Sequence, residues 1–85
     1  MEVIFSANAI EDLNYWKHTG NEKVLIRIRS LIQDIKNEPF RGIGKPEPLK
    51  YNLSGMWSRR INREHRIIYE VESGFITIHA LKEHY

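Results

Sequence analysis

The sequence contains no cysteine and no long apolar run. Without cysteine, neither disulfide bonds nor thiolate metal sites can form. No run of consecutive apolar residues exceeds three, whereas a transmembrane helix needs about 20. We therefore expect a cytoplasmic protein without membrane contact. A chain of 85 residues also predicts a single domain, residues 1–85, with one modest core.

Acidic residues are scarce in one stretch, residues 41–66. This stretch has seven basic and two acidic residues, a net charge of +5, while the remainder has six basic and nine acidic residues, a net charge of −3. Segregated cations are typical of proteins that bind polyanions, because Lys and Arg release counterions from phosphates. A solvated basic face without a partner explains the charge equally well. The basic residues are Arg41, Lys45, Lys50, Arg59, Arg60, Arg63 and Arg66.

Proline is also rare, and two of the three prolines enclose one acid, Glu47, in the run KPEPLK. A proline ring fixes its own φ and biases the preceding residue toward an extended conformation. The pattern predicts extended backbone at Lys45 and Glu47 and a stiff chain around the carboxylate. Such a carboxylate loses less entropy when it takes up a catalytic position. The alternative is that Pro-Glu-Pro only stiffens a connector and its acid is solvated.

The first half of the chain predicts a strand followed by two helices. Residues 2–5 are β-branched and aromatic, and Ser6 is a suitable N-cap for a helix over residues 7–18 that ends at Gly20. Asn21 caps a second helix, which continues to about Lys36. The apolar face of the first helix is predicted to hold Ile10, Leu13 and Trp16. That of the second is predicted to hold Val24, Leu25, Ile28, Leu31, Ile32 and Ile35.

The second half alternates polar and apolar residues, which predicts four strands. They cover residues 49–53, 57–62, 66–72 and 75–81, and the last two are joined by a turn at Ser73-Gly74. Pairing across that turn places Ile67, Tyr69 and Val71 on one face with Ile78, Ile76 and Ala80, respectively. We expect the helices to cover that face of a mostly antiparallel, twisted sheet. The opposite face, with Arg66, Ile68, Thr77 and His79, is then left partly open.

Several motifs carry a family resemblance. Residues 45–71, KPEPLKYNLSGMWSRRINREHRIIYEV, and the final His-Tyr pair resemble the YoeB/Txe toxins of the RelE superfamily. The motifs KPEPLK, LSGMWSRRI, EHR and HY occur in the family's order and spacing, and the similarity extends over essentially the whole chain. The resemblance implies an α+β fold like that of small microbial ribonucleases, in the order β-α-α-β-β-β-β. It also implies a toxin that cuts mRNA in the ribosomal A site without a metal or other cofactor.

The resemblance assigns catalysis to four residues. The acid of the Pro-Glu-Pro unit is Glu47, the arginine after Glu-His is Arg66, and the final pair is His84 and Tyr85. Metal-free RNA cleavage needs a base for the ribose 2′-hydroxyl, a cation for the phosphoryl charge and an acid for the departing 5′-oxygen. Glu47, Arg66 and His84 supply one of each. Tyr85 is expected to stack on a base or orient the RNA, with an aromatic lid as the alternative.

Four further cations are expected to bind RNA: Lys45, Lys50, Arg59 and Arg60. Strand alternation lets only one of the two neighbouring arginines face the open side of the sheet. Arg60 is the better candidate, because Arg59 shares a face with Trp57 and Ile61, which are expected to be buried. Trp57 itself is read as a core or interface residue rather than a base-stacking platform.

The chain end departs from the family pattern at one position. Many relatives have an aromatic residue before the final His-Tyr, and here Glu83 places an anion beside the expected acid, His84. Only the terminal motif distinguishes His84 from the other histidines, which have ordinary positions available in a helix end, a turn and a sheet. Near-neutral titration suits a histidine to proton donation. The other histidines are His18, His65 and His79.

The resemblance also predicts partners. These are an acidic, partly disordered antitoxin of the YefM type, the 70S ribosome with mRNA, operator DNA through the antitoxin complex, and a second copy of the chain in a homodimer. Two other functions remain open at this point. The basic segment suffices for a protein that blocks translation by binding RNA or the ribosome without cutting, and a co-repressor of its own operator is an added role.

Overall fold

The predicted order of elements is present in the computed structural model, which describes residues 1–82. After the second helix, and before the strand that begins at Met56, the chain makes a short strand and one turn of 3₁₀-helix. The elements are β1 (Glu2–Phe5), α1 (Ala7–His18), α2 (Glu22–Asn37), β2 (Glu47–Pro48), η1 (Tyr51–Leu53), β3 (Met56–Arg60), β4 (Arg66–Glu72) and β5 (Phe75–Ala80).

Both helices begin at the caps that the sequence predicts. The Ser6 hydroxyl accepts a hydrogen bond from the Ala9 amide at 3.1 Å, and the Asn21 side chain accepts one from the Val24 amide at 3.2 Å. Each cap satisfies an amide that has no partner within its helix. Within residues 1–82, neither helix is long and apolar enough to cross a membrane.

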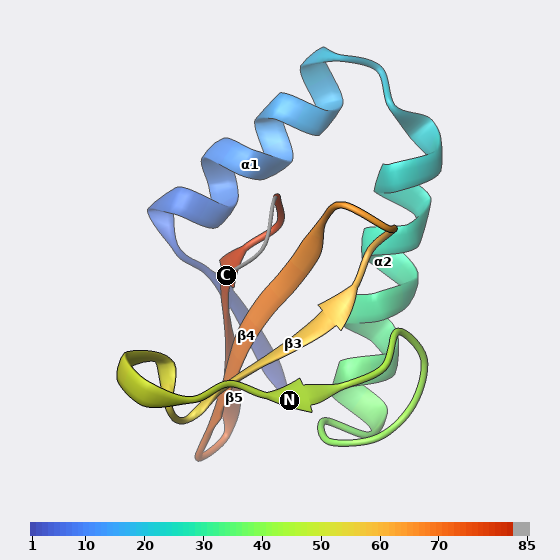
Figure 1. The fold of residues 1–85 in the computed structure, drawn as a ribbon. Coiled ribbons are helices and arrows are strands. Elements are labelled where there is room, and N and C mark those ends of the chain that lie inside the picture. Colours follow the sequence, from blue (N-terminus) through green and yellow to red (C-terminus); the bar gives the residue numbers. More distant parts are fainter. Residues whose placement is uncertain (83–85) are drawn as a thin grey trace.

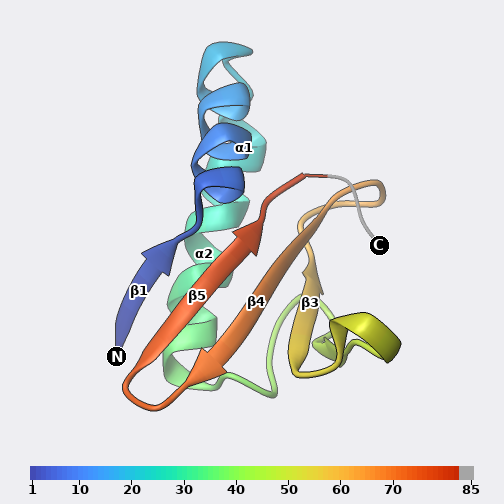
Figure 2. The same ribbon diagram turned by 90° about the vertical axis from the view of Figure 1, so that its left-hand side faces the viewer.

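The five strands form one sheet in the order β1-β5-β4-β3-β2. Only β1 and β5 run parallel, and the other neighbours are antiparallel. Both helices lie on the same side of this sheet, as Figures 1 and 2 show. The predicted α+β architecture is therefore confirmed. The buried core between helices and sheet consists of Ala9, Trp16, Val24, Ile28, Leu31, Ile35, Ile61, Ile67, Tyr69, Ile76, Ile78 and Leu81.

The predicted apolar face of α1 was wrong at one position. Ile10 is 48% exposed, and Ala9 is fully buried in its place. A small residue there is consistent with a close approach of the helix to β5, the strand with which α1 makes most of its sheet contacts. The predicted stripe of α2 is confirmed, since Val24, Ile28 and Leu31 are buried along it.

The predicted register of the β4–β5 hairpin was also wrong. Tyr69 lies opposite Ile78, and Val71 lies opposite Ile76. A shift in the ladder between Ile68 and Tyr69 then pairs Ile68 with Ala80. Such a bulge adds one residue to one strand and changes the pairing beyond it.

The predicted strand over residues 49–53 is absent. Residues Tyr51–Leu53 form the helical turn η1, and the strand β2 comes earlier, at Glu47–Pro48. Tyr51 has a φ of 59°, which is incompatible with a strand. This turn also changes the outer face of the sheet, where Leu53 and Met56 line a hollow together with Ile68. Ile68 is only 1% exposed, so this part of the outer face is not open as predicted.

Candidate functional site

The outer face of the sheet brings Glu47 and Arg66 into adjacent rows. Glu47 on β2 lies opposite Ser58 on β3, which lies opposite Ile68 on β4. Two residues further along β3, Arg60 lies opposite Arg66. Paired residues, and residues two apart on one strand, point to the same face. Glu47 and Arg66 are therefore separated by two strand spacings across the sheet and by two residues along the strands. Standard strand dimensions put their Cα atoms roughly 12 Å apart.

The Arg66 guanidinium is held against the β3–β4 turn. Its Nη1 donates to the carbonyl oxygens of Asn62 at 3.1 Å, Arg63 at 3.3 Å and His65 at 3.3 Å. The two N–H groups of Nη1 are shared among these three acceptors, which hold this end of the guanidinium at the turn while the side chain stays partly exposed. An arginine held in this way presents a planar cation of fixed direction, the form best suited to a phosphate.

The backbone around Glu47 is fixed on both sides of β2. Glu47 is exposed, and within residues 1–82 its carboxylate forms no ion pair. The prediction of extended backbone at Glu47 is confirmed by its place in β2. The same prediction for Lys45 was wrong, because its φ is 53°. The Gly44 carbonyl accepts a hydrogen bond from the Arg60 amide at 2.7 Å, which turns the chain sharply before Pro46.

Arg59 does not belong with the predicted RNA-binding residues. Its side chain is fully buried, so the structure leaves Lys45, Lys50 and Arg60, all of them exposed. The Arg59 guanidinium donates to the carboxylate of Asp34 at 2.5 Å and to the carbonyl oxygens of Glu38 at 2.5 Å, Arg41 at 2.8 Å and Ile43 at 3.1 Å. These bonds fasten the loop between α2 and β2 to the sheet. Arg59 thus anchors the segment that leads directly into Glu47.

Residues 5–85 match a family model described as the YoeB-like toxin of a bacterial type II toxin-antitoxin system. The chain belongs to this family of YoeB-like toxins. The resemblance seen in the motifs around Glu47 and Arg66 is thereby confirmed over nearly the whole sequence.

Known relatives agree with this assignment in sequence and in fold. Toxin YoeB of Escherichia coli strain K12 is 46% identical over 85 residues, which cover 100% of both chains. The structure of a YoeB dimer from Staphylococcus aureus has a TM-score of 0.91 at 42% identity and matches 100% of this chain and 98% of that one. A YoeB-YefM complex from the same organism has a TM-score of 0.90 at 43% identity, with the same coverage.

Two groups that contact Arg59 in this YoeB-like toxin have shifted pKa values. The hydrogen bond from Arg59 holds the pKa of the Asp34 carboxyl below its ordinary 3.8, and a second bond from the Ile43 amide acts in the same direction. Burial raises the pKa of the Tyr69 hydroxyl. That hydroxyl donates to the Pro39 carbonyl at 2.6 Å. The loop is thus bound by an ionised carboxylate and a protonated phenol at neutral pH.

Removal of the Asp34 charge is expected to loosen this anchor. We expect Asp34→Asn to lower the free energy of unfolding at pH 7 by about 2 kcal/mol, because the buried guanidinium loses its counterion. The folded-state pKa is lowered, so the contribution of Asp34 is complete above pH 3.8 and is lost as the pH falls through the folded-state value. The difference between native and variant proteins in urea unfolding should therefore be the same at pH 7 and pH 5 and smaller at pH 3.

The matched control for Asp34 is Glu38→Gln. Glu38 pairs with Arg41 on the surface, where the two side chains are 56% and 84% exposed. An ion pair of this kind contributes about 0 to 1 kcal/mol. An equal loss of stability in Glu38→Gln and Asp34→Asn would contradict the anchoring role of the Arg59 pair.

The loop also requires a glycine at position 44. A Cβ atom there would lie 2.9 Å from Cδ2 of Leu31 and 3.2 Å from both Cβ of Arg59 and the carbonyl oxygen of Arg60. We expect Gly44→Ala to lower the free energy of unfolding by about 1 to 3 kcal/mol more than Gly55→Ala, because only the first variant adds a steric clash. Both glycines have a positive φ, 82° and 99°, but a Cβ atom added at Gly55 would meet no other residue's atoms within 4 Å, its two chain neighbours aside. Equal urea midpoints for the two variants would show that the contacts at Gly44 are unimportant.

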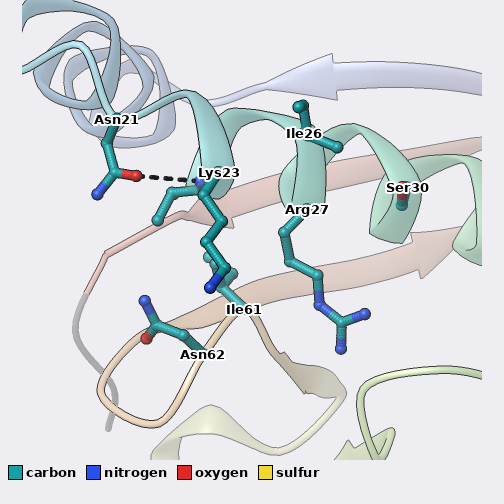
Figure 3. Close-up of a pocket in the computed structure, with 8 residues that line it drawn as sticks. Asn21, Lys23, Ile26, Arg27, Ser30, Ile61 and Asn62 are labelled. Atoms are coloured by element: carbon teal, nitrogen blue, oxygen red, sulfur yellow. Dashed lines mark hydrogen bonds between the residues drawn. The ribbon is translucent and has the colours of Figure 1, made fainter.

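A groove of about 410 Å³ lies on the helix side of the β3–β4 turn. Figure 3 shows Lys23 extending from α2 toward Ile61 and Asn62, with Arg27 beside it on the same helix. Arg27 donates to the Arg60 carbonyl at 3.2 Å. Among the described residues, the side chains that line the groove include two cations and no acid. Such a lining suits a ligand that has an acidic group next to an apolar one. The Asn62 carbonyl also accepts a hydrogen bond from Arg66, so the groove and the sheet face that holds Glu47 and Arg66 share one turn.

The predicted residues His84 and Tyr85, with Glu83 before them, lie outside the described residues, so their roles remain predictions. Trp57 is partly buried against the core, in agreement with a packing role. Sequence reasoning missed Tyr51, whose side chain is 90% exposed beside Lys50. Its only signal in the sequence was an aromatic residue immediately after KPEPLK.

Proposed function

We propose that this YoeB-like toxin is a ribosome-dependent mRNA endoribonuclease that acts in the A site and inhibits translation. The observation that supports the proposal best is the placement of Glu47 and Arg66 on one sheet face in adjacent rows. Within the described part of the chain, Glu47 has no cation that neutralises it, so it can accept a proton. Arg66 has a fixed guanidinium on the same face.

The reaction follows from the chemistry of these side chains. Glu47 takes the proton of the ribose 2′-hydroxyl, and the 2′-oxygen attacks the adjacent phosphorus. Arg66 stabilises the charge that builds on the phosphoryl oxygens. The bond from phosphorus to the 5′-oxygen breaks while His84 donates a proton to that oxygen. The products are a 2′,3′-cyclic phosphate and a 5′-hydroxyl end. Tyr85 orients the RNA, and Lys45, Lys50 and Arg60 bind its backbone.

The same proposal includes protein partners and a place of action. A YefM-like antitoxin binds and inhibits the toxin, and their complex carries the toxin to operator DNA. The YoeB-YefM complex and the YoeB dimer known from Staphylococcus aureus support an antitoxin partner and a homodimer. The chain acts as one domain in the cytoplasm, where ribosomes are present. The groove lined by Lys23 and Arg27 offers an acidic antitoxin a contact of complementary charge.

Primer extension on a defined mRNA in a purified translation system tests this function. With ribosomes, the native chain should create new RNA ends, and without ribosomes it should create few. His84→Ala should lower the cleavage rate by about 10²- to 10⁴-fold, the usual contribution of a general acid. His18→Ala is the control, because His18 is exposed at the end of α1. Inhibition of translation without new RNA ends would favour a non-cleaving, ribosome-binding inhibitor instead.

A further inference from the structure

Tyr51 has no structural reason to be an aromatic residue. It is the most exposed of the large hydrophobic side chains in residues 1–82, at 90%. An aromatic ring contributes to folding mainly through the area that it buries, and Tyr51 buries almost none. Packing in the core therefore does not explain why this residue is aromatic.

The backbone at Tyr51 is unfavourable as well. Within residues 1–82, two residues other than glycine have a positive φ, Lys45 at 53° and Tyr51 at 59°. For a bulky side chain this conformation is a genuine outlier, and such outliers cluster at binding and catalytic sites. Hydrogen bonds from Leu53 to the Lys50 carbonyl at 3.1 Å and from Ser54 to the Tyr51 carbonyl at 3.0 Å maintain the turn. Glycine or asparagine would adopt it at lower cost.

The strained turn lies beside the candidate active site. The two positive-φ residues enclose β2, the strand that carries Glu47. The turn η1 also contributes Leu53 to the hollow of about 460 Å³ on the outer face of the sheet. Figure 2 shows η1 next to β3, at the edge of the sheet away from β1. The exposed ring of Tyr51 thus lies at the border of the sheet face that holds Glu47 and Arg66.

The exposed ring of Tyr51 beside a cation favours a single-stranded nucleic acid as its partner. Lys50 is its neighbour in sequence, Lys45 is exposed at the other end of β2, and Arg60 is exposed on β3. Bases stack on exposed aromatic rings while nearby cations bind the phosphates. An exposed ring next to a cation is an arrangement that single-stranded RNA-binding surfaces use.

We propose that Tyr51 is a substrate-binding residue whose ring stacks on an unpaired base of the RNA next to the scissile bond. This proposal rests on the proposed ribonuclease function and adds to it a contact that sets affinity. Because the ring contacts a base and no reacting atom, its loss should raise KM and leave kcat nearly unchanged. A rigid, prearranged ring also costs the complex less conformational entropy than a mobile one.

The test compares binding and cleavage in Tyr51→Ala, Tyr51→Gly, Tyr51→Trp and the native chain. Binding is measured with 70S ribosomes that carry an mRNA with a 2′-deoxy nucleotide at the cleavage position, which cannot be cut. Tyr51→Ala and Tyr51→Gly should weaken binding by about 5- to 150-fold, and Tyr51→Trp should bind at least as well as the native chain. With a cleavable mRNA, KM should rise by the same factor as Kd.

Two controls separate stacking from folding. Tyr51→Gly removes the ring together with the backbone strain, so it should unfold at a higher temperature than Tyr51→Ala and still bind as weakly. Tyr15→Ala removes another exposed tyrosine, on α1 and 45% exposed, and should leave binding unchanged.

The outcomes distinguish this proposal from the one on which it rests. Equal Kd and KM in the native chain and Tyr51→Ala would overturn the stacking role while cleavage itself stands. Ring-dependent binding without any cleavage of the normal mRNA would support stacking and overturn the ribonuclease function. Normal ribosome binding but weakened antitoxin binding in Tyr51→Ala would assign the ring to a protein partner and overturn the proposal.

Discussion

Glu47→Gln is expected to lower the rate of ribosome-dependent cleavage by about 10²- to 10⁴-fold, because an amide cannot take the proton of the 2′-hydroxyl. Glutamine has the size of glutamate, and Glu47 lies in a strand that pairs through its backbone with Ser58. The fold and the rigid Pro-Glu-Pro backbone should therefore be retained. Single-turnover cleavage of an A-site codon, with the toxin in excess over ribosomes, measures the chemical step directly.

The control for this experiment is Glu64→Gln. Glu64 is the other acid of the basic segment, and it is exposed on the β3–β4 turn. Both variants change the net charge by the same amount. A loss of cleavage rate that came only from altered electrostatic attraction to RNA would therefore occur in both. A Glu47→Gln enzyme that cleaves within about threefold of the Glu64→Gln enzyme would rule out Glu47 as the general base.

Sequence reasoning succeeded where local patterns determine the structure. Both helices start and end close to the predicted residues, because caps at Ser6 and Asn21 and the spacing of apolar residues are local signals. Strand alternation predicted that Arg66 faces away from the core, whereas its nearness to Glu47 was predicted only through the family resemblance. Their adjacency depends on the register among β2, β3 and β4, and the turns that connect these strands do not reveal that register in the sequence.

The errors occurred where tertiary contacts override local preferences. The prediction that Arg59 binds RNA was wrong, although alternation had correctly placed its side chain on the buried face. Its partners are Asp34 and carbonyls of the preceding loop, which no sequence period reveals. Proline at position 46 favours an extended Lys45. The contact between Gly44 and Arg60 imposes a turn at that point instead. Tyr51 was assigned to a strand because polar and apolar residues alternate over residues 49–53, and only the structure reveals its positive φ.

Arg66→Lys is expected to lower kcat by about 10²- to 10³-fold, although it keeps the positive charge. The guanidinium uses Nη1 to bind three carbonyls of the β3–β4 turn, and its remaining donors can reach a phosphate in the same plane. A lysine ammonium is a single point charge, so bonding to the turn competes with bonding to the phosphate. The loss matches the removal of one fixed donor from a charge-stabilising site.

Arg63→Lys is the matched control for Arg66→Lys. Arg63 lies on the same turn, is exposed, and belongs to the same basic segment, so both variants keep charge and change only the geometry of one cation. Single-turnover rates should fall in Arg66→Lys alone, while the Kd for ribosomes changes little in either variant. Thermal unfolding checks that the turn persists, since each bond lost to the turn contributes about 0.5 to 1.5 kcal/mol. If the two variants cleave at the same rate, charge alone suffices at position 66. The hydrogen bonds that hold the Arg66 guanidinium would then stabilise the turn without contributing to catalysis.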